Sequence, residues 1–477
     1  MTMFSIGDLG TLVLEWINAT NDFLWTYIII VLLVICAVYF TVRTRGVQFY
    51  LFKDMVRVMF GRDKNKKDIA QRKKGVGSFG AFAISLSSRV GTGNLAGVAS
   101  AIVVGGPGAV FWMWVMALLG AATAFVESTL AQLYKKKGKD SYYGGPAYYM
   151  QTGLKRKWMG VVFAVLITCT FGMAYQVLQS NTMCAALSNA VGIDKLWLGI
   201  FFTAITLLII FGGVQRVSKF SSIVAPIMAM GYILLAIYIV ITNFMHIPEV
   251  LKLIFNSAFG LEQFAGGTIG AAIMQGVKRG LFSNEAGEGS APNAAAIAET
   301  SHPVKQGLVQ ALGVFVDTLV ICTCTAFIIL ITDSVSSGED GILLTTFAVE
   351  SEMGVAGRYF IAAAIFLLAY STIIGNYFYG ETNIRFITNK SYAVTAFRFV
   401  TGGMVMIGAI VTLQTAWSFV DLMMGLMTLF NLVAILLLSN KVFRLLRNYM
   451  EQKRAGKEPE FKRNMMPDIE KDIEAWD

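Results

Sequence analysis

The sequence predicts an all-α integral membrane protein with about 11 transmembrane helices, in which two inverted five-helix repeats follow one additional N-terminal helix. Of its 477 residues, 56% are hydrophobic and only 14% are charged, whereas soluble domains carry roughly 25% charged residues. Apolar runs of about 20 residues recur along the chain, and each can cross a hydrocarbon core of ~30 Å as a helix. Each repeat also begins with a glycine-interrupted segment, which is typical of transporters that bind their substrate at the membrane midplane.

The first apolar run is longer than the core of a signal peptide and is followed by Arg43 and Arg45, so we expect a permanent anchor. Ten further runs follow it with short connections. Their ends are defined only to within a few residues. The expected spans are 24–43, 78–104, 108–134, 158–187, 196–213, 223–243, 264–286, 305–332, 358–386, 391–414 and 416–439.

The basic residues orient these helices. Most Lys and Arg residues flank apolar runs in 43–74, 135–157 and 441–477, whereas 1–24 and 332–357 contain none. Because basic flanks stay on the cytoplasmic side, we expect the N-terminus outside and the C-terminus inside the cell (inner) membrane. The net charge of +9 therefore indicates contact with anionic lipid headgroups and not with nucleic acid.

An odd number of spans in this orientation divides the chain into four parts. The two repeats then start in opposite directions, as inverted repeats require. The polar C-terminal tail is expected to be disordered or loosely helical. The parts are an extracellular segment with the extra helix and a basic loop (1–77), the first repeat (78–243), the second repeat (244–439) and the cytoplasmic tail (440–477).

The first repeat begins with a helix that carries a charge and a helix breaker at its centre, in the stretch RVGTGN (89–94). Unwinding a helix inside lipid leaves backbone groups without partners unless the break lines a polar cavity. The N–H groups of the downstream half suit a carboxylate, and the carbonyls that end the upstream half suit a small cation. Glycines that only permit close helix packing are the alternative, but the neighbouring Arg89 and Asn94 need polar partners.

Two further polar clusters lie at the centres of apolar runs. Ser371 and Thr372 occupy the middle of their span, and Thr372 shares a helix face with Asn376 one turn later. Hydroxyl oxygens there suit Na⁺, although an interhelical hydrogen bond would also explain them. Tyr175 and Gln179 share a face of the 158–187 span and line a cavity or glue helices together.

A family resemblance becomes clear at RGLFSNEAGEGSAPNAAA (279–296) and continues through RVGTGNLAGVA, GGPAYYM and STIIGNYFYGE. With these motifs the chain resembles the alanine or glycine:cation symporter family over 11–445. The resemblance implies Na⁺-driven uptake of a small neutral amino acid, with H⁺ as the alternative ion. It also implies a LeuT-like scaffold of five plus five helices, a lipid bilayer as its environment and a monomer.

The resemblance also assigns residues to sites. The unwound first helix is expected to hold the substrate carboxylate, and carbonyls and hydroxyls beside it to hold sodium. The glycine-rich motif at 283–290 is expected at the cytoplasmic end of the 264–286 helix, as a hinge or inner gate. The substrate residues are Gly91, Thr92, Gly93, Asn94, Tyr175, Gln179, Thr372 and Asn376. The sodium ligands are Ser87, Val90, Asn94, Leu368, Ser371 and Thr372, and the gate residues are Gly276, Ser283, Asn284, Glu285, Gly287 and Gly289.

One position departs from the family pattern. Many members have Trp after the glycine of S-T-x-x-G-W, whereas this chain has Asn376. A smaller polar side chain would widen the pocket and add an amide. Alanine and glycine are therefore not the only expected substrates, and glutamine becomes plausible.

Other functional classes fit less well. An intramembrane hydrolase needs a His/Asp pair, paired Asp or a metal cluster, but the two histidines, His246 and His302, lie near span ends and far apart in sequence. Glu285 and Glu288 flank a tight turn and are not expected to be catalytic. A channel is harder to exclude, but it has no need for a pocket of amino-acid size beside an ion site. We therefore predict a secondary active symporter and no enzyme activity.

Overall fold

The computed structural model describes residues 6–60, 76–138, 141–212, 214–260 and 268–476. These residues are almost entirely helical, and one short antiparallel hairpin pairs β1 with β2. The part of the expected 264–286 span that precedes residue 268 lies outside the described residues.

The helices and strands follow one another along the chain in this order. The first half contains α1 (Ile6–Phe23), η1 (Leu24–Ile29), α2 (Ile30–Arg43), α3 (Val47–Tyr50), α4 (Phe52–Phe60), α6 (Ser78–Arg89), η2 (Gly93–Gly97), α7 (Val98–Gly105), α8 (Gly108–Leu133), β1 (Lys136–Lys137), β2 (Tyr142–Tyr143), α9 (Pro146–Thr152), α10 (Lys157–Cys169), η3 (Thr170–Ala174), α11 (Tyr175–Val191), α12 (Lys195–Phe211) and α13 (Val214–Thr242). The second half contains η4 (Phe244–His246), α14 (Ile247–Ala258), α15 (Ile269–Asn284), α16 (Ala291–Ala296), α17 (Pro303–Val314), η5 (Phe315–Cys322), α18 (Thr323–Ile331), η6 (Ser334–Ser337), α19 (Gly341–Met353), α20 (Val355–Ile387), α21 (Ser391–Ile410), α22 (Leu413–Arg454), η7 (Arg463–Met465) and η8 (Glu470–Asp472).

Every expected span coincides with a described helix or broken helix, so the prediction of a polytopic all-α membrane protein is confirmed. By length and composition alone, 7 helical runs among the described residues can cross a membrane, and a pair bent by 80° would make up to 8. The count is lower than 11 because broken or short helices, such as Gly93–Gly105 and Lys195–Phe211, fail a length criterion. The first run, Gly10–Arg43, starts earlier than predicted because α1, η1 and α2 are continuous.

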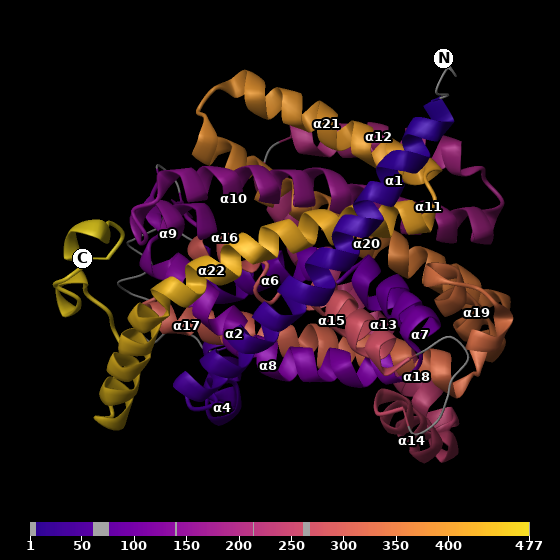
Figure 1. The fold of residues 1–477 in the computed structure, drawn as a ribbon, viewed down its shortest axis with the longest axis horizontal. Coiled ribbons are helices and arrows are strands. Elements are labelled where there is room, and N and C mark those ends of the chain that lie inside the picture. Colours follow the sequence, from indigo (N-terminus) through magenta and orange to yellow (C-terminus); the bar gives the residue numbers. More distant parts are fainter. Residues whose placement is uncertain (1–5, 61–75, 139–140, 213, 261–267, 477) are drawn as a thin grey trace.

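The helices pack as two groups that meet at α6. In one group α8 lies against α15 and α17, and in the other α20 lies against α11 and α13. The half-helix α6 contacts helices of both groups, namely α13, α17 and α20. Figure 1 shows the long helices running along the longest axis of the molecule, with the two chain ends at opposite ends of it.

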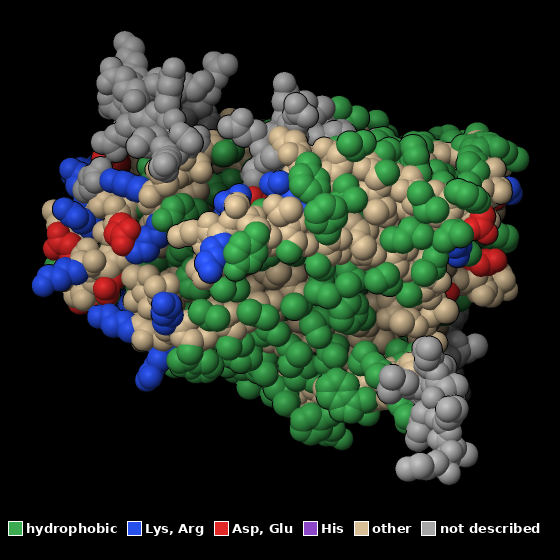
Figure 2. All heavy atoms as spheres, turned by 90° about the horizontal axis from the view of Figure 1, so that it is seen from above, with side chains coloured by type: hydrophobic (Ala, Val, Ile, Leu, Met, Phe, Trp, Pro, Cys, Tyr) green, Lys and Arg blue, Asp and Glu red, His purple; other side chains and the backbone are tan. Residues whose placement is uncertain are grey.

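The surface is divided in the way that a bilayer requires. Large apolar side chains such as Trp197, Leu208 and Met230 are exposed, and hydrophobic side chains cover the middle of the face in Figure 2. Lys and Arg side chains gather at the left end of that view, which is the end that carries the C-terminal segment in Figure 1. The basic residues thus lie at one end of the molecule, and the assignment of that end to the cytoplasm stays a prediction.

The C-terminal tail is ordered, which corrects the prediction of a disordered or loosely helical segment. Beyond α22 it folds back in short 3₁₀ turns, and it buries Phe461, Ile473 and Trp476. Trp476 Nε1 donates to the carbonyl of Gln132 (2.9 Å), and the N–H of Phe461 donates to the carbonyl of Ser301 (2.9 Å). The prediction considered only the polar composition, whereas a few widely spaced apolar residues suffice to anchor the tail.

Candidate functional site

The first core helix is interrupted where the sequence predicts it. α6 ends at Arg89, Val90 is extended (φ −79°, ψ 102°), and helical structure resumes in η2 at Gly93. All side chains and glycines across this break are fully or almost fully buried. The interruption therefore lies inside the helix bundle and not at its surface.

Close approach of two other helices explains the first glycine of the break. A Cβ added to Gly91 would lie 2.5 Å from Thr372 Oγ1 and 3.1 Å from Gln179 Oε1. Both distances are too short for an ordinary van der Waals contact. Because Gly91 has no side chain, polar atoms of α11 and α20 can contact the backbone of the break directly.

Two backbone N–H groups of the break are capped by side-chain oxygens. Gly91 N–H donates to Asn94 Oδ1 (2.9 Å), and Thr92 N–H donates to Gln179 Oε1 (3.2 Å). The hydroxyl of Thr92 donates to the same Gln179 oxygen (2.7 Å). These acceptors occupy the place where a substrate carboxylate would accept hydrogen bonds from a helix N-terminus.

The predicted sodium ligands converge around one hydroxyl. Thr372 Oγ1 lies 3.0 Å from the Ser87 carbonyl, 3.2 Å from the Val90 carbonyl and 3.0 Å from the Leu368 carbonyl, while Ser371 Oγ donates to the same Leu368 oxygen (2.8 Å). A hydroxyl has one proton and can donate to only one of the three carbonyls. The group therefore contains more acceptors than donors, which favours a cation.

Asn94 does not join that group and instead belongs to a second buried cluster. Its Nδ2 donates to Asp317 Oδ1 (2.7 Å) and to Ser283 Oγ (3.1 Å), and Ser283 Oγ donates to Asp317 Oδ2 (2.5 Å). Sequence reasoning missed Asp317. The feature that could have identified it is a single carboxylate in the otherwise apolar run FVDTLVIC. This run forms the π-helical segment η5, which packs against η2.

The predicted interruption of the second repeat, 264–276, lies partly outside the described residues, and the described part from Ile269 onward is helical. α15 is continuous from Ile269 to Asn284, so Gly276 is not a break; a Cβ there would lie 2.5 Å from Trp112 Cβ, and the glycine serves close packing on α8. The chain breaks at the predicted gate motif, where Glu285 (φ 56°), Gly287 (φ 97°) and Gly289 (φ 88°) adopt left-handed conformations before α16.

This second break is buried among other helices, so its residues do not form a solvent-exposed loop. Its expected position at the cytoplasmic end of the helix stays a prediction. Glu285 accepts a hydrogen bond from Ser290 (2.5 Å), and its Oε1 lies 2.9 Å from the Ser88 hydroxyl. The structure brings the two broken helices together at Ser88.

Tyr175 and Asn376, the last two predicted substrate residues, border the same region. The Tyr175 hydroxyl lies 3.0 and 2.9 Å from the two carboxylate oxygens of Glu288, to which it donates its proton, and its ring lies 4.8 Å from that of Phe282. Asn376 Oδ1 lies 2.9 Å from the same Ser88 hydroxyl, which can donate its one proton to only one of Glu285 and Asn376. Asn376 Nδ2 is buried without a hydrogen-bond partner among the described residues. Asn284 donates to Thr318 (3.2 Å) and thereby tethers the second break to η5.

The buried charges of this region are unequal in number. Glu127, Glu285 and Glu288 interact electrostatically with Arg89, the guanidinium on the last residue of α6. Arg89 Nη1 donates to the Gln310 carbonyl (3.3 Å), and its Nε and Nη2 have no partner within the described part of the chain. Carboxylates thus outnumber the guanidinium, and a cation or protons would balance them.

Known proteins similar to this chain are membrane transporters. A family model described as the sodium:alanine symporter family matches residues 10–463. The "Probable sodium/glutamine symporter GlnT" of Bacillus subtilis (strain 168) is 48% identical over 462 residues, which cover 96% of this chain and 95% of that protein. The "Amino-acid carrier protein AlsT" of the same organism is 47% identical over 461 residues, 97% of both chains.

Among solved structures, the Eremococcus coleocola manganese transporter superposes on this chain with a TM-score of 0.52 at 12% sequence identity. The alignment covers 78% of this chain and 87% of that chain. This likeness concerns the fold alone, and it agrees with the predicted LeuT-like class.

Proposed function

The chain belongs to the sodium:alanine symporter family, and we propose that it imports a small neutral amino acid together with Na⁺. The family and its relatives are transporters, so the protein is an integral multi-pass membrane transporter and not an enzyme. The observation that carries the proposal is the interrupted α6–η2 helix, whose two free ends meet oxygens of α20 and α11.

The proposed Na⁺ position lies among the carbonyls of Ser87, Val90 and Leu368 and the hydroxyls of Ser371 and Thr372. The break removes the helical N–H partners that carbonyls near the end of α6 would otherwise have. All five oxygens belong to neutral groups, so a bound Na⁺ brings one positive charge to the end of α6. Hard cations prefer such oxygen ligands.

The proposed substrate position lies beside the N–H groups of Gly91 and Thr92. There the carboxylate of an amino acid replaces the capping oxygens of Asn94 and Gln179 and gains the positive end of the following helix. Substrate and Na⁺ thus bind on opposite sides of one short break. Binding of either one favours the unwound conformation that the other needs, which is a direct basis for coupled transport.

Glutamine is included among the proposed substrates together with alanine and glycine. Asn376 Nδ2 is a buried donor without a partner in the described chain, and a side-chain amide would supply the acceptor. The name of the 48% identical Bacillus subtilis relative points the same way.

Coupling to H⁺ is the second candidate, because Glu127, Glu285 and Glu288 are buried with Arg89 as the cation that interacts with all three. Protons bound in one conformation and released in another would balance these charges. In either case we propose alternating access between 78–243 and 244–439, with the N-terminus outside and the C-terminus in the cytoplasm.

Uptake into proteoliposomes tests the proposal. Labelled alanine, glycine and glutamine are each supplied with an inward Na⁺ gradient, with an inward H⁺ gradient, or with neither. We expect accumulation only with the Na⁺ gradient. Accumulation driven by an H⁺ gradient alone would show that H⁺, and not Na⁺, is the coupling ion. Equilibration of the amino acid without accumulation would contradict symport.

A further inference from the structure

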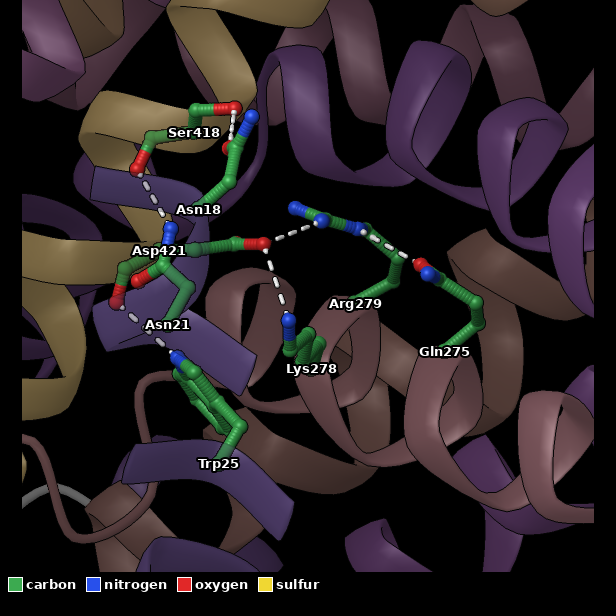
Figure 3. Close-up of polar contacts among 8 residues, drawn as sticks. All are labelled: Asn18, Asn21, Trp25, Gln275, Lys278, Arg279, Ser418 and Asp421. Atoms are coloured by element: carbon green, nitrogen blue, oxygen red, sulfur yellow. Dashed lines mark hydrogen bonds and ion pairs between the residues drawn. The ribbon is translucent and has the colours of Figure 1, made fainter. Parts of the chain in front are cut away.

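A buried ionic cluster joins α15 to α22 (Figure 3). Arg279 Nη2 lies 2.8 Å and Lys278 Nζ 3.4 Å from the same Asp421 oxygen, Oδ2. All three residues are more than nine-tenths buried. Two cations therefore share one carboxylate, and the cluster has a surplus of positive charge.

Three buried polar atoms of this cluster have no hydrogen-bond partner in the part of the chain that the structure describes. They are Arg279 Nη1, Asp421 Oδ1 and Trp417 Nε1. The guanidinium of Arg279 stacks on the Trp417 ring, 3.8 Å from its centroid, so these groups lie together. A buried polar group without a hydrogen-bond partner is destabilising, so the presence of three such atoms in one cluster favours a ligand with matching groups.

A single layer of aromatic side chains separates the cluster from the proposed substrate position. The Trp417 ring lies 5.0 Å from that of Phe282, which in turn packs on Tyr175 at 4.8 Å. A Cβ added to Gly93 would lie 3.0 Å from the Phe282 ring. The path from the cluster to the break is thus Arg279, Trp417, Phe282 and Gly93.

From these contacts we propose that the Arg279–Asp421 pair is a reception site, which binds the zwitterionic amino acid before it passes Phe282 to the break. The unpartnered atoms match a zwitterion: the carboxylate accepts from Arg279 Nη1 and Trp417 Nε1, and the ammonium group donates to Asp421 Oδ1. The inference rests on the proposed function, because it takes the substrate to be an amino acid.

Lys278, the second cation of the cluster, has a role of its own in this proposal. When Arg279 turns toward the substrate carboxylate, Lys278 stays paired with Asp421 and prevents an isolated buried carboxylate. The N-terminal helices hold this arrangement: Lys278 Nζ lies 5.3 Å from the Trp25 ring centroid, and Trp25 Nε1 donates to the Asp421 carbonyl (3.1 Å). The extra helix thus positions the reception site.

Binding kinetics of labelled glutamine to the purified protein in Na⁺ test the inference. Arg279→Gln should lower the association rate constant roughly tenfold, because loss of a hydrogen bond to a charged group weakens the complex through which the amino acid reaches the break. Arg279→Lys keeps the charge, but an ammonium group does not have the two Nη groups of a guanidinium, one for Asp421 and one for the substrate carboxylate. This variant should therefore recover only part of the association rate. Arg358→Gln is the matched control, because it removes an arginine that pairs with Glu350 near the start of α20, and it should leave the rate unchanged.

Two outcomes would overturn the reception site. In the first, Arg279→Gln accelerates association, which means that the Arg279–Asp421 pair holds α15 and α22 together and blocks access without binding the substrate. In the second, association is unchanged while Na⁺-dependent equilibrium binding is normal. Absence of Na⁺-dependent binding of any neutral amino acid by the native protein would instead overturn the proposed function.

Discussion

Thr372 Oγ1 on α20 lies 3.0 Å from the carbonyl oxygen of Ser87 on α6, and this contact joins the two helices at the end of the broken span. Neither residue is charged, and they are 285 positions apart in sequence. At the proposed Na⁺ position this hydroxyl would be a ligand that is in place only when α6 and α20 are close. Loss of that hydroxyl should therefore affect ion binding before it affects the fold.

The first prediction is that Thr372→Ala raises the Na⁺ concentration for half-maximal uptake by about tenfold, a typical loss of metal affinity when a supporting group is removed. Thr382→Ala is the control, because the Thr382 hydroxyl donates only to the Phe378 carbonyl of its own helix (2.9 Å). Sodium titrations of uptake measure both variants. An unchanged Na⁺ requirement in well-folded Thr372→Ala would remove Thr372 from the ion site.

The second prediction concerns the glycines of the break. Gly93→Leu should abolish substrate binding, because even a Cβ there meets the Phe282 ring at 3.0 Å and the Ser283 backbone at 3.2 Å. Gly403→Leu should bind normally, since a Cβ at that position on α21 meets no atom within 4 Å. Equilibrium binding of labelled amino acid distinguishes the two. Near-native affinity in Gly93→Leu would mean that the break does not contact the substrate.

The first break was predictable from sequence because its glycines are combined with polar residues that a packing seam would not need. The residues of the second break were identified from the glycine-rich motif, but Gly276 was grouped with them although it is no break. Gly276 and Gly287 look alike in sequence, yet Gly276 lies in a continuous helix against Trp112 and Gly287 has φ 97°. Only backbone conformation separates a packing glycine from a hinge glycine.

Clusters that join distant segments are the other part that sequence reasoning missed. Asp317 meets Asn94 across 223 positions, and Asp421 meets Arg279 across 142. Periodicity along one helix shows which residues share a face, but it does not show which helix that face meets. Helix packing decides these contacts, so they became visible only in the fold.

The third prediction is that acid releases the C-terminal tail. His302 is buried against Tyr449 and Phe461, its Nδ1 accepts from the Val304 N–H (3.2 Å), and burial lowers its pKa from 6.5 to about 3. Between pH 6.5 and 3 an exposed histidine binds a proton that the docked state excludes. Tail docking should therefore be strongest above pH 6.5 and weaken below it, by about 1.4 kcal/mol per pH unit.

Tryptic cleavage between α22 and Trp476 measures that release as a function of pH. His302→Asn can still cap the N–H of Val304 but cannot titrate in this range, so its cleavage should not depend on pH below 6.5. Faster cleavage of the native protein at pH 5 than at pH 7.5, corrected for the activity of trypsin itself, is the expected result. Equal acid sensitivity in both proteins would assign the effect to another group.

The last prediction concerns substrate selectivity at Asn376. This residue lies one turn after Thr372, its Oδ1 lies 2.9 Å from the Ser88 hydroxyl, and its Nδ2 is a buried donor without a partner in the described chain. Glutamine should therefore compete for transport in the native protein, and Asn376→Trp should remove that competition while alanine uptake persists, because an indole leaves room only for a small side chain. Asn376→Ala keeps the space but loses the amide, so glutamine should still enter the pocket but compete less strongly for transport. Sites that hydrogen-bond a substrate group discriminate by up to ~10⁴-fold, so competition by unlabelled glutamine measures the effect directly. If glutamine does not compete in the native protein, the amide of Asn376 plays no part in selectivity.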